Sequence, residues 1–100
     1  MSIVYLSNYV FESLTPFADK TFTNGAAAAN LGAIGTGNTK GIVLRANATI
    51  RIGDATNKPT ATSGFKLLAN EMIVININVP TDLYIYADGA DATVNGCVLR

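Results

Sequence analysis

One eight-residue stretch in the second half of the chain, residues 72–79, constrains the fold more than any other. Read in twos, one side of this stretch carries the apolar set Ile73, Ile75, Ile77 and Val79. The other side carries Met72, Val74, Asn76 and Asn78, and a two-residue period of this kind is typical of a β-strand with one dry and one wetter face. Burying each apolar side chain contributes about 1.5–3 kcal/mol. A shift of one residue would bury the asparagines instead, so we expect a fixed register and a central place for this strand.

Shorter segments with a similar alternation lie on both sides of it. We expect strands over residues 42–46, 49–52, 64–68, 83–87 and 92–99, the last with a glycine bulge at Asn95-Gly96. In the segment 83–87, the residues Leu83, Ile85 and Ala87 should face inward and the two tyrosines outward. Turn residues such as Asn70 and Gly89 separate the segments. Short strands at close spacing predict an all-β fold, a β-sandwich or jelly-roll-like domain.

Residues 1–40 lack this regularity, and we expect them to form an extended N-terminal arm, whereas residues 41–100 form the sandwich core of a single domain. In the arm, Thr15-Pro16 should end a first extended segment, and residues 20–23 should be a short edge strand. A Gly/Ala-rich loop follows up to Lys40. A long connection with little structure of its own is uncommon inside a compact domain, so we expect a neighbouring subunit to hold it.

Charge is scarce in this chain. Charged residues make up 14% of its 100 residues, the net charge is zero, and 49% of the residues are hydrophobic, against roughly 25% charged residues in ordinary soluble domains. Two readings stay open: a neutral polar surface, or a surface covered by partners. Without a basic excess we do not expect nucleic acid as a partner, and without a long apolar run we do not expect a membrane span. The single cysteine, Cys97, reads as a small packed hydrophobe.

The glycine-rich stretch 32–39 matches the phosphate-binding pattern GxxxxGK[ST] except that Asn38 stands where lysine belongs. That lysine is the group that reaches the phosphates, and the pattern should open a helix, whereas a strand is expected to follow here. We therefore favour a flexible or docking loop over a nucleotide site. The chain has no histidine, the usual general base, and we identify no catalytic constellation, so we expect no enzyme and no cofactor.

Two aspartates close together, Asp88 and Asp91, with Asp82 nearby, raise the question of a calcium site. Calcium loops usually alternate their oxygen ligands and end in a bidentate glutamate, which this segment lacks. A turn stabilised by aspartate side chains is therefore favoured, and no metal is expected.

Large apolar and aromatic side chains of the arm, together with the outward tyrosines, are candidate interface residues. They are Tyr5, Tyr9, Phe11, Phe17, Phe22, Leu31, Ile34, Tyr84 and Tyr86. If the strand 83–87 neighbours residues 76–78, the tyrosines and asparagines would form one face able to bind sugar or protein. Plain cross-strand packing on a partly covered sheet is the alternative, and it is favoured.

A series of strand and turn signals runs through residues 41–100. Its members are the strand Ala48–Gly53, a variable polar loop, Thr62–Leu67, the turn Asn70-Glu71, an apolar strand, Asp82–Ala87 and Asp91–Val94. This series resembles a group of small bacteriophage virion structural proteins of the capsid decoration (cement) type. The resemblance implies a β-sandwich attached to a phage head or to the head-to-tail region.

The function implied by this resemblance is that of a capsid decoration protein on the virion surface, which stabilises the head shell by bridging capsomers. The expected partners are the major capsid protein and further copies of the chain, as a homotrimer. Two alternatives stay open: a head–tail adaptor or tail structural protein, and a carbohydrate- or receptor-binding module that uses the tyrosine face.

Overall fold

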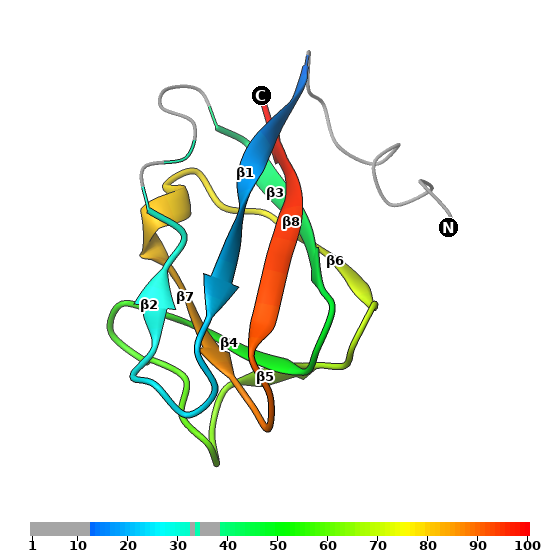
Figure 1. Ribbon diagram of the computed structural model, residues 1–100. Helices are drawn as coiled ribbons and strands as arrows, with labels where there is room; N and C mark the ends of the chain where they lie inside the picture. Colours follow the sequence, from blue (N-terminus) through cyan, green and yellow to red (C-terminus); the bar gives the residue numbers. More distant parts are fainter. Residues whose placement is uncertain (1–12, 33, 35–38) are drawn as a thin grey trace.

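The computed structural model describes residues 13–32, 34 and 39–100, which form two four-stranded antiparallel sheets packed face to face (Figure 1). Sheet A contains, in spatial order, β1 (Leu14–Phe22), β8 (Ala92–Leu99), β3 (Gly41–Ala46) and β6 (Met72–Ile75). Sheet B contains β2 (Ala29–Asn30), β7 (Leu83–Ala87), β4 (Ile50–Asp54) and β5 (Phe65–Leu67). A 3-10 turn, η2 (Pro80–Asp82), leads into β7. The predicted all-β sandwich is confirmed.

The strands pair as nested partners along the chain. β1 pairs with β8, β2 with β7, β3 with β6 and β4 with β5, each time antiparallel. The chain therefore runs like one long folded hairpin, with the loop between β4 and β5 as its tip. At its base, Ser13 and Arg100 exchange two backbone N–H···O hydrogen bonds of 3.1 Å. Eight strands paired in this order across two sheets form a jelly roll.

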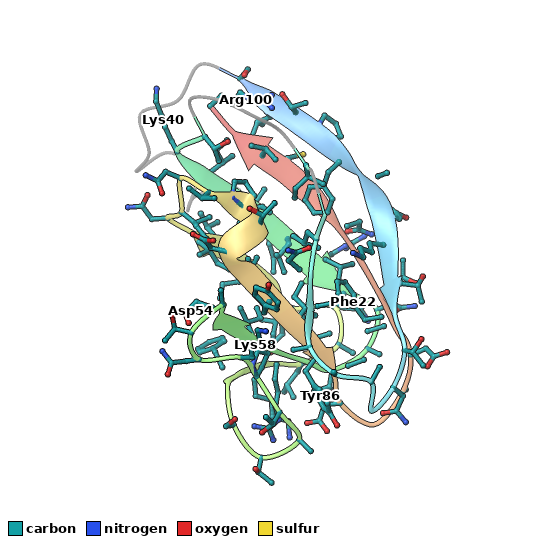
Figure 2. All side chains as sticks on the ribbon, turned by 90° about the vertical axis from the view of Figure 1, so that its left-hand side faces the viewer. Phe22, Lys40, Asp54, Lys58, Tyr86 and Arg100 are labelled. Atoms are coloured by element: carbon teal, nitrogen blue, oxygen red, sulfur yellow. The ribbon has the colours of Figure 1, made fainter. Side chains whose placement is uncertain are left out.

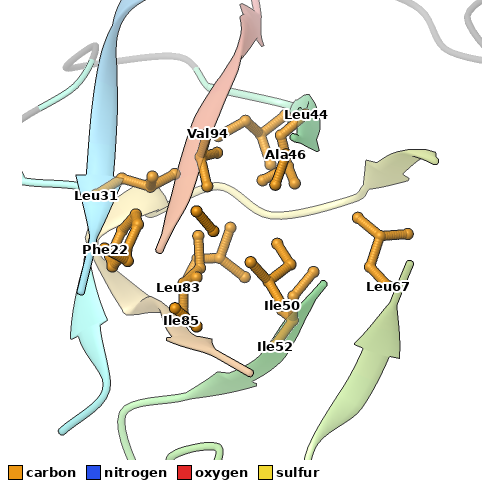
Figure 3. Close-up of a cluster of buried hydrophobic side chains, with 13 residues drawn as sticks. Phe22, Leu31, Leu44, Ala46, Ile50, Ile52, Leu67, Leu83, Ile85 and Val94 are labelled. Atoms are coloured by element: carbon orange, nitrogen blue, oxygen red, sulfur yellow. The ribbon is translucent and has the colours of Figure 1, made fainter. Parts of the chain in front are cut away.

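The core lies between the inner faces of the two sheets (Figure 3). Alternation places its side chains as the sequence predicts: in β7, the residues Leu83, Ile85 and Ala87 are buried, and both tyrosines point outward. In β4, Ile50 and Ile52 are buried, whereas the residue between them is half-buried on the outer face. Central strands of sheet A contribute the opposing layer, including Ile42, Leu44, Ala46, Ala92 and Val94.

Residues 72–79 have the predicted inward face but a different place in the fold. β6 ends at Ile75 and is the outermost strand of sheet A. Ile73, Ile75 and Ile77 are half-buried against the core, and Val79 is 44% exposed. The prediction of a central buried strand is therefore wrong, because alternation reports which side chains share a face and not how many neighbours a strand has.

The sandwich also begins earlier than predicted. β1 runs straight through Thr15-Pro16, and residues 14–31, assigned from sequence to an arm, supply strands to both sheets. Pro16 is tolerated inside β1 because β1 is an edge strand, where a missing backbone N–H can face solvent. Of the predicted arm, residues 1–12 lie outside the described residues.

Core position predicts a clear difference between two isoleucines. Ile50→Ala removes a side chain with 0% exposure, so we expect it to lower the free energy of unfolding by about 2–5 kcal/mol. Ile75→Ala acts at a half-buried edge position and should cost about half as much. Urea denaturation of both variants measures the difference, and equal losses would contradict the edge assignment of β6.

Close approach between β3 and β8 is made possible by Gly96. A Cβ atom at this position would overlap the Val43 carbonyl oxygen and lie 2.9 Å from Leu44 Cα. β8 pairs with β3 without a register shift at this point, so the bulge predicted at Asn95-Gly96 does not occur in β8. The irregularity lies instead on the facing edge strand, between Phe17 and Lys20. The glycine marks a tight backbone contact rather than an inserted residue.

We expect Gly96→Ala to destabilise the fold by about 1–3 kcal/mol, because the methyl group must push β3 and β8 apart. Asn95→Ala is the matched control, since Asn95 is the preceding residue of the same strand and its contact with Arg45 is an exposed 3.4 Å hydrogen bond. The control should change stability by about 0.5 kcal/mol or less. Equal thermal unfolding midpoints for the two variants would contradict the close-approach argument.

Candidate interaction surface at the open edge of the sandwich

The two side edges of the sandwich differ, and the edge formed by β1 and β2 is closed. Phe22 and Leu31 are buried there, at 6% and 4% exposure. Lys20 Nζ donates a 2.7 Å hydrogen bond to the backbone oxygen of Asn30, which joins sheet A to sheet B. The same ammonium lies 5.4 Å from the centre of the Phe22 ring, a favourable cation–π distance.

The opposite edge, formed by β5 and β6, holds an open apolar groove of about 350 Å³. Its lining combines residues of both sheets: Ile52, Gly53, Asp54, Phe65, Ile73, Ile75, Ile77, Asp82 and Leu83. Most of these side chains are apolar, and two carboxylates stand at the rim. A groove of this composition suits apolar side chains of a partner better than a charged ligand.

Phe65 shows most clearly that this edge is open. It stands opposite Ile52 in the β4–β5 ladder, so its side chain lies on the inner side of sheet B. Ile52 is 8% exposed, but Phe65 is 60% exposed, because the strand that holds it is the outermost of its sheet. Leu67, two residues along the same strand, is covered and lies at 5% (Figure 3).

Two of the large exposed apolar side chains, Phe65 and Leu68, lie on the β5 side of this edge. Phe65 and Leu68 belong to or directly follow β5, and Val79 lies in the segment that follows β6. Their exposed fractions are 60%, 52% and 44%. Leu14, at the start of β1, is the remaining large apolar residue exposed to this degree among the described residues. The edge therefore offers exposed apolar area, above all that of the Phe65 ring, for a partner to bury.

The loop from β4 to β5 is held by its own polar contacts. Asp54 accepts hydrogen bonds from the backbone N–H groups of Thr56 and Asn57, at 3.0 and 2.6 Å through the same Oδ1 atom. Pro59 is buried against Gly53 and Gly64. Asp54 therefore shapes the rim of the groove by ordering this loop.

Tyr84 and Tyr86 lie half-buried on the outer face of sheet B. The face shared with Asn76 and Asn78, which was considered only if the two strands were neighbours, does not form, because β7 belongs to sheet B and the asparagines follow β6 of sheet A. Lys58 Nζ lies 5.0 Å from the centre of the Tyr84 ring. Lys58 and Tyr86 are labelled in Figure 2. The sequence left this face conditional, because alternation does not say which strands become neighbours.

Basic and acidic groups accompany the tyrosines on that face. Tyr86 pairs with Arg51 across β4 and β7, and Arg51 Nε donates a 3.0 Å hydrogen bond to Asp88 Oδ2 in a partly buried salt bridge. Tyr86 itself is half-exposed. This face stays a possible contact surface of mixed polarity.

Two of the aspartates considered as calcium ligands, Asp88 and Asp91, instead make contacts that hold turns in this structure. Asp91 Oδ1 accepts the Asn24 backbone N–H at 2.8 Å, and Asn24 Oδ1 accepts the Gly89 backbone N–H at 3.0 Å. Asp88 is engaged by the arginine of β4. Within the described residues no group of three or more potential metal ligands occurs.

Four of the predicted interface residues pack within the sandwich. Phe22 and Leu31 are core residues, so the prediction that they contact a partner is wrong for this structure. Phe17 and Ile34 are half-buried against the same core. Within the described part of the Gly/Ala-rich loop, Leu31 and Ile34 therefore pack on their own domain, and contact of the loop with a neighbouring subunit stays a prediction.

Some predicted interface residues lie outside the described part of the chain. Conversely, one exposed residue of the groove was not singled out from the sequence. Tyr5, Tyr9 and Phe11 lie outside the described residues, as do positions 33 and 35–38 of the glycine-rich stretch. Phe65, the most exposed lining residue of the groove, was assigned from sequence only to a strand. Its position directly after a long polar loop was the available signal of an edge.

Comparisons with protein-family models, with curated proteins and with solved structures each find no match. Among the described residues, no helix is long and apolar enough to cross a membrane. A function is therefore inferred from the groove, the fold and the chemistry of the surface residues.

Phenylalanines at the two edges should respond differently to truncation. Phe22→Ala empties a buried site at the closed edge, and we expect a loss of about 3–5 kcal/mol in the free energy of unfolding. Phe65→Ala removes a ring that is 60% exposed, and in dilute solution it should cost less than about 1 kcal/mol. Urea denaturation measures both values, and a large loss for Phe65→Ala would show that the groove is closed in solution.

Proposed function

We propose that this protein is a bacteriophage capsid decoration (cement) protein, which stabilises the head shell by bridging capsomers. The observation that carries the proposal is the open apolar edge between β5 and β6, because a protein acting through surface burial needs such a face. Its partners on the virion surface are the major capsid protein and further copies of the chain, arranged as a trimer.

The edge supports this role through its energetics. Covering the half-exposed isoleucines of β6 and the ring of Phe65 removes apolar surface from water at about 25 cal/mol per Å². One such contact is modest, but a shell repeats it at every equivalent position, so the gain is multiplied over the particle. Low charge adds to the argument, since 14% charged residues give little electrostatic resistance to close packing.

The topology gives further support by analogy. Jelly rolls occur in viral capsid domains and in lectin domains, and the nested strand order found here is of that kind. Fold alone does not specify function, so the analogy raises the weight of both a virion role and a sugar-binding role. The apolar character of the open edge favours the virion role.

Protein quantification in purified virions tests the proposal. We expect a copy number comparable with that of the major capsid protein, and particles lacking the protein should break at lower temperature. A few copies confined to one vertex would contradict the decoration role and would favour a head–tail adaptor or a tail component.

A matched pair of variants connects the test to the groove. Phe65→Ser should weaken addition of the purified protein to particles that lack it, because it removes the exposed ring from the edge. Leu14→Ser is the control, since Leu14 is 46% exposed on the opposite edge of the sandwich. Equal weakening by both variants, measured by co-sedimentation with particles, would show that the groove is not the shell contact.

A carbohydrate- or receptor-binding module is the second candidate, favoured by the half-exposed tyrosines on the outer face of sheet B. A tyrosine ring offers a flat apolar surface with a polar tip, which suits sugars. This role predicts glycan binding that is lost in Tyr86→Ala and retained in Phe65→Ser, the reverse of the pattern expected for shell binding.

A further inference from the structure

We infer that the groove between β5 and β6 receives residues 3–11 of a second copy of this chain, added as an antiparallel strand on the outer side of β6. The inference goes beyond the proposed function, because it concerns contact between copies in the absence of any shell.

β6 provides the template for an added strand. It pairs with β3 on one side, and no described strand forms a ladder on its other side. An edge strand presents its outward backbone N–H and C=O groups to any extended segment that can reach them. Main-chain hydrogen bonds would supply affinity, and the groove beside β6 would select the side chains.

Side chains beneath the edge fit an apolar strand. Ile73 and Ile75 stand opposite Leu44 and Ile42, so they point toward the core side of sheet A. Together with Phe65 of the facing sheet, they line the groove. A strand added to β6 would lay every second side chain over these three residues.

Residues 3–11 have the composition that this site requires. Their sequence, Ile-Val-Tyr-Leu-Ser-Asn-Tyr-Val-Phe, carries no charge and is rich in β-branched and aromatic residues. In an extended chain, Ile3, Tyr5, Tyr9 and Phe11 would share one face. Nine extended residues span about 30 Å, more than twice the roughly 13 Å of the four residues of β6. The segment is therefore long enough to cover the edge and leave a connection.

Strand direction favours a second copy as the donor. One row across sheet A reads Thr15, Val98, Ile42 and Ile75, so β6 ends at the same end of the sheet at which β1 begins. A segment that leads into Ser13 of the same chain would therefore have to run parallel to β6. A segment from another copy can run antiparallel, as in every ladder of the described residues, and antiparallel pairing is the more stable per residue.

Chemical cross-linking of the full-length chain tests this inference directly. In a Cys97→Ser background, Tyr5→Cys and Phe65→Cys are made as separate variants and mixed, and a short bismaleimide is added. Because the linker spans a range of distances, the cross-link does not require one exact pairing register between the added strand and β6. We expect a cross-linked dimer from the mixture and little dimer from either variant alone. Leu68→Cys replaces Phe65→Cys in the control mixture, because Leu68 is 52% exposed but does not line the groove.

Each other outcome overturns the inference. Dimer formed by Phe65→Cys alone would mean that two β6 edges pair with each other. A chain carrying both cysteines that cross-links only within itself at every concentration would place the segment in its own groove. Absence of any product between chains, or equal yield in the control mixture, would mean that no segment of a second copy binds there.

Self-association provides an independent measurement in solution. Sedimentation equilibrium should show that Phe65→Ser raises the dissociation constant for self-association at least about tenfold, while Leu68→Ser leaves it unchanged. Equal constants for Phe65→Ser and the unaltered protein would contradict the inference. Because this experiment contains no shell, its failure would leave the proposed shell contact to be judged separately from the particle-binding experiment.

Discussion

Pairing between β3 and β8 is the contact on which the jelly roll depends, because these two strands form the centre of sheet A. β8 joins β1 on one side and β3 on the other, and β3 in turn carries β6. Gly96 permits the short backbone distance between them, where a side chain would overlap the Val43 carbonyl. If β8 were displaced, sheet A would separate into an isolated β1 and a two-stranded remnant, and its half of the core would open to water.

The two edges of the sandwich solve the exposed-strand problem differently. At the β1–β2 edge, a lysine bridges the sheets and a phenylalanine fills the space beneath it. At the β5–β6 edge, a groove lies between the two sheets, and the core residues Ile52 and Leu83 are part of its lining. Natural sheets usually protect their edges with charge or with proline, and β6, which holds neither, departs from that practice. This departure is the physical basis for assigning interaction to that edge.

Most strands could be predicted from alternation alone, and the inward and outward residues of β4 and β7 follow the predicted pattern. What alternation could not supply is the order of strands within the sheets. For that reason residues 72–79 were expected at the centre, and whether the tyrosines of β7 lie beside Asn76 was left open. Only the end of β1 was predicted, as the edge strand 20–23. Most residues of β1 are exposed, so its nine-residue length leaves little apolar periodicity. The groove depends on the relation of β5 to β6 across two sheets, which no local pattern contains.

The central position of β8 has a consequence for synthesis on the ribosome. Strands β1 to β7 leave the exit tunnel before β8 does, yet β1 and β3 have no ladder to each other without it. Until Leu99 has emerged, β1 therefore has no partner in sheet A, and β3 can pair only with β6 on one of its two sides. During that interval the polypeptide is a natural client for chaperones that hold extended hydrophobic segments.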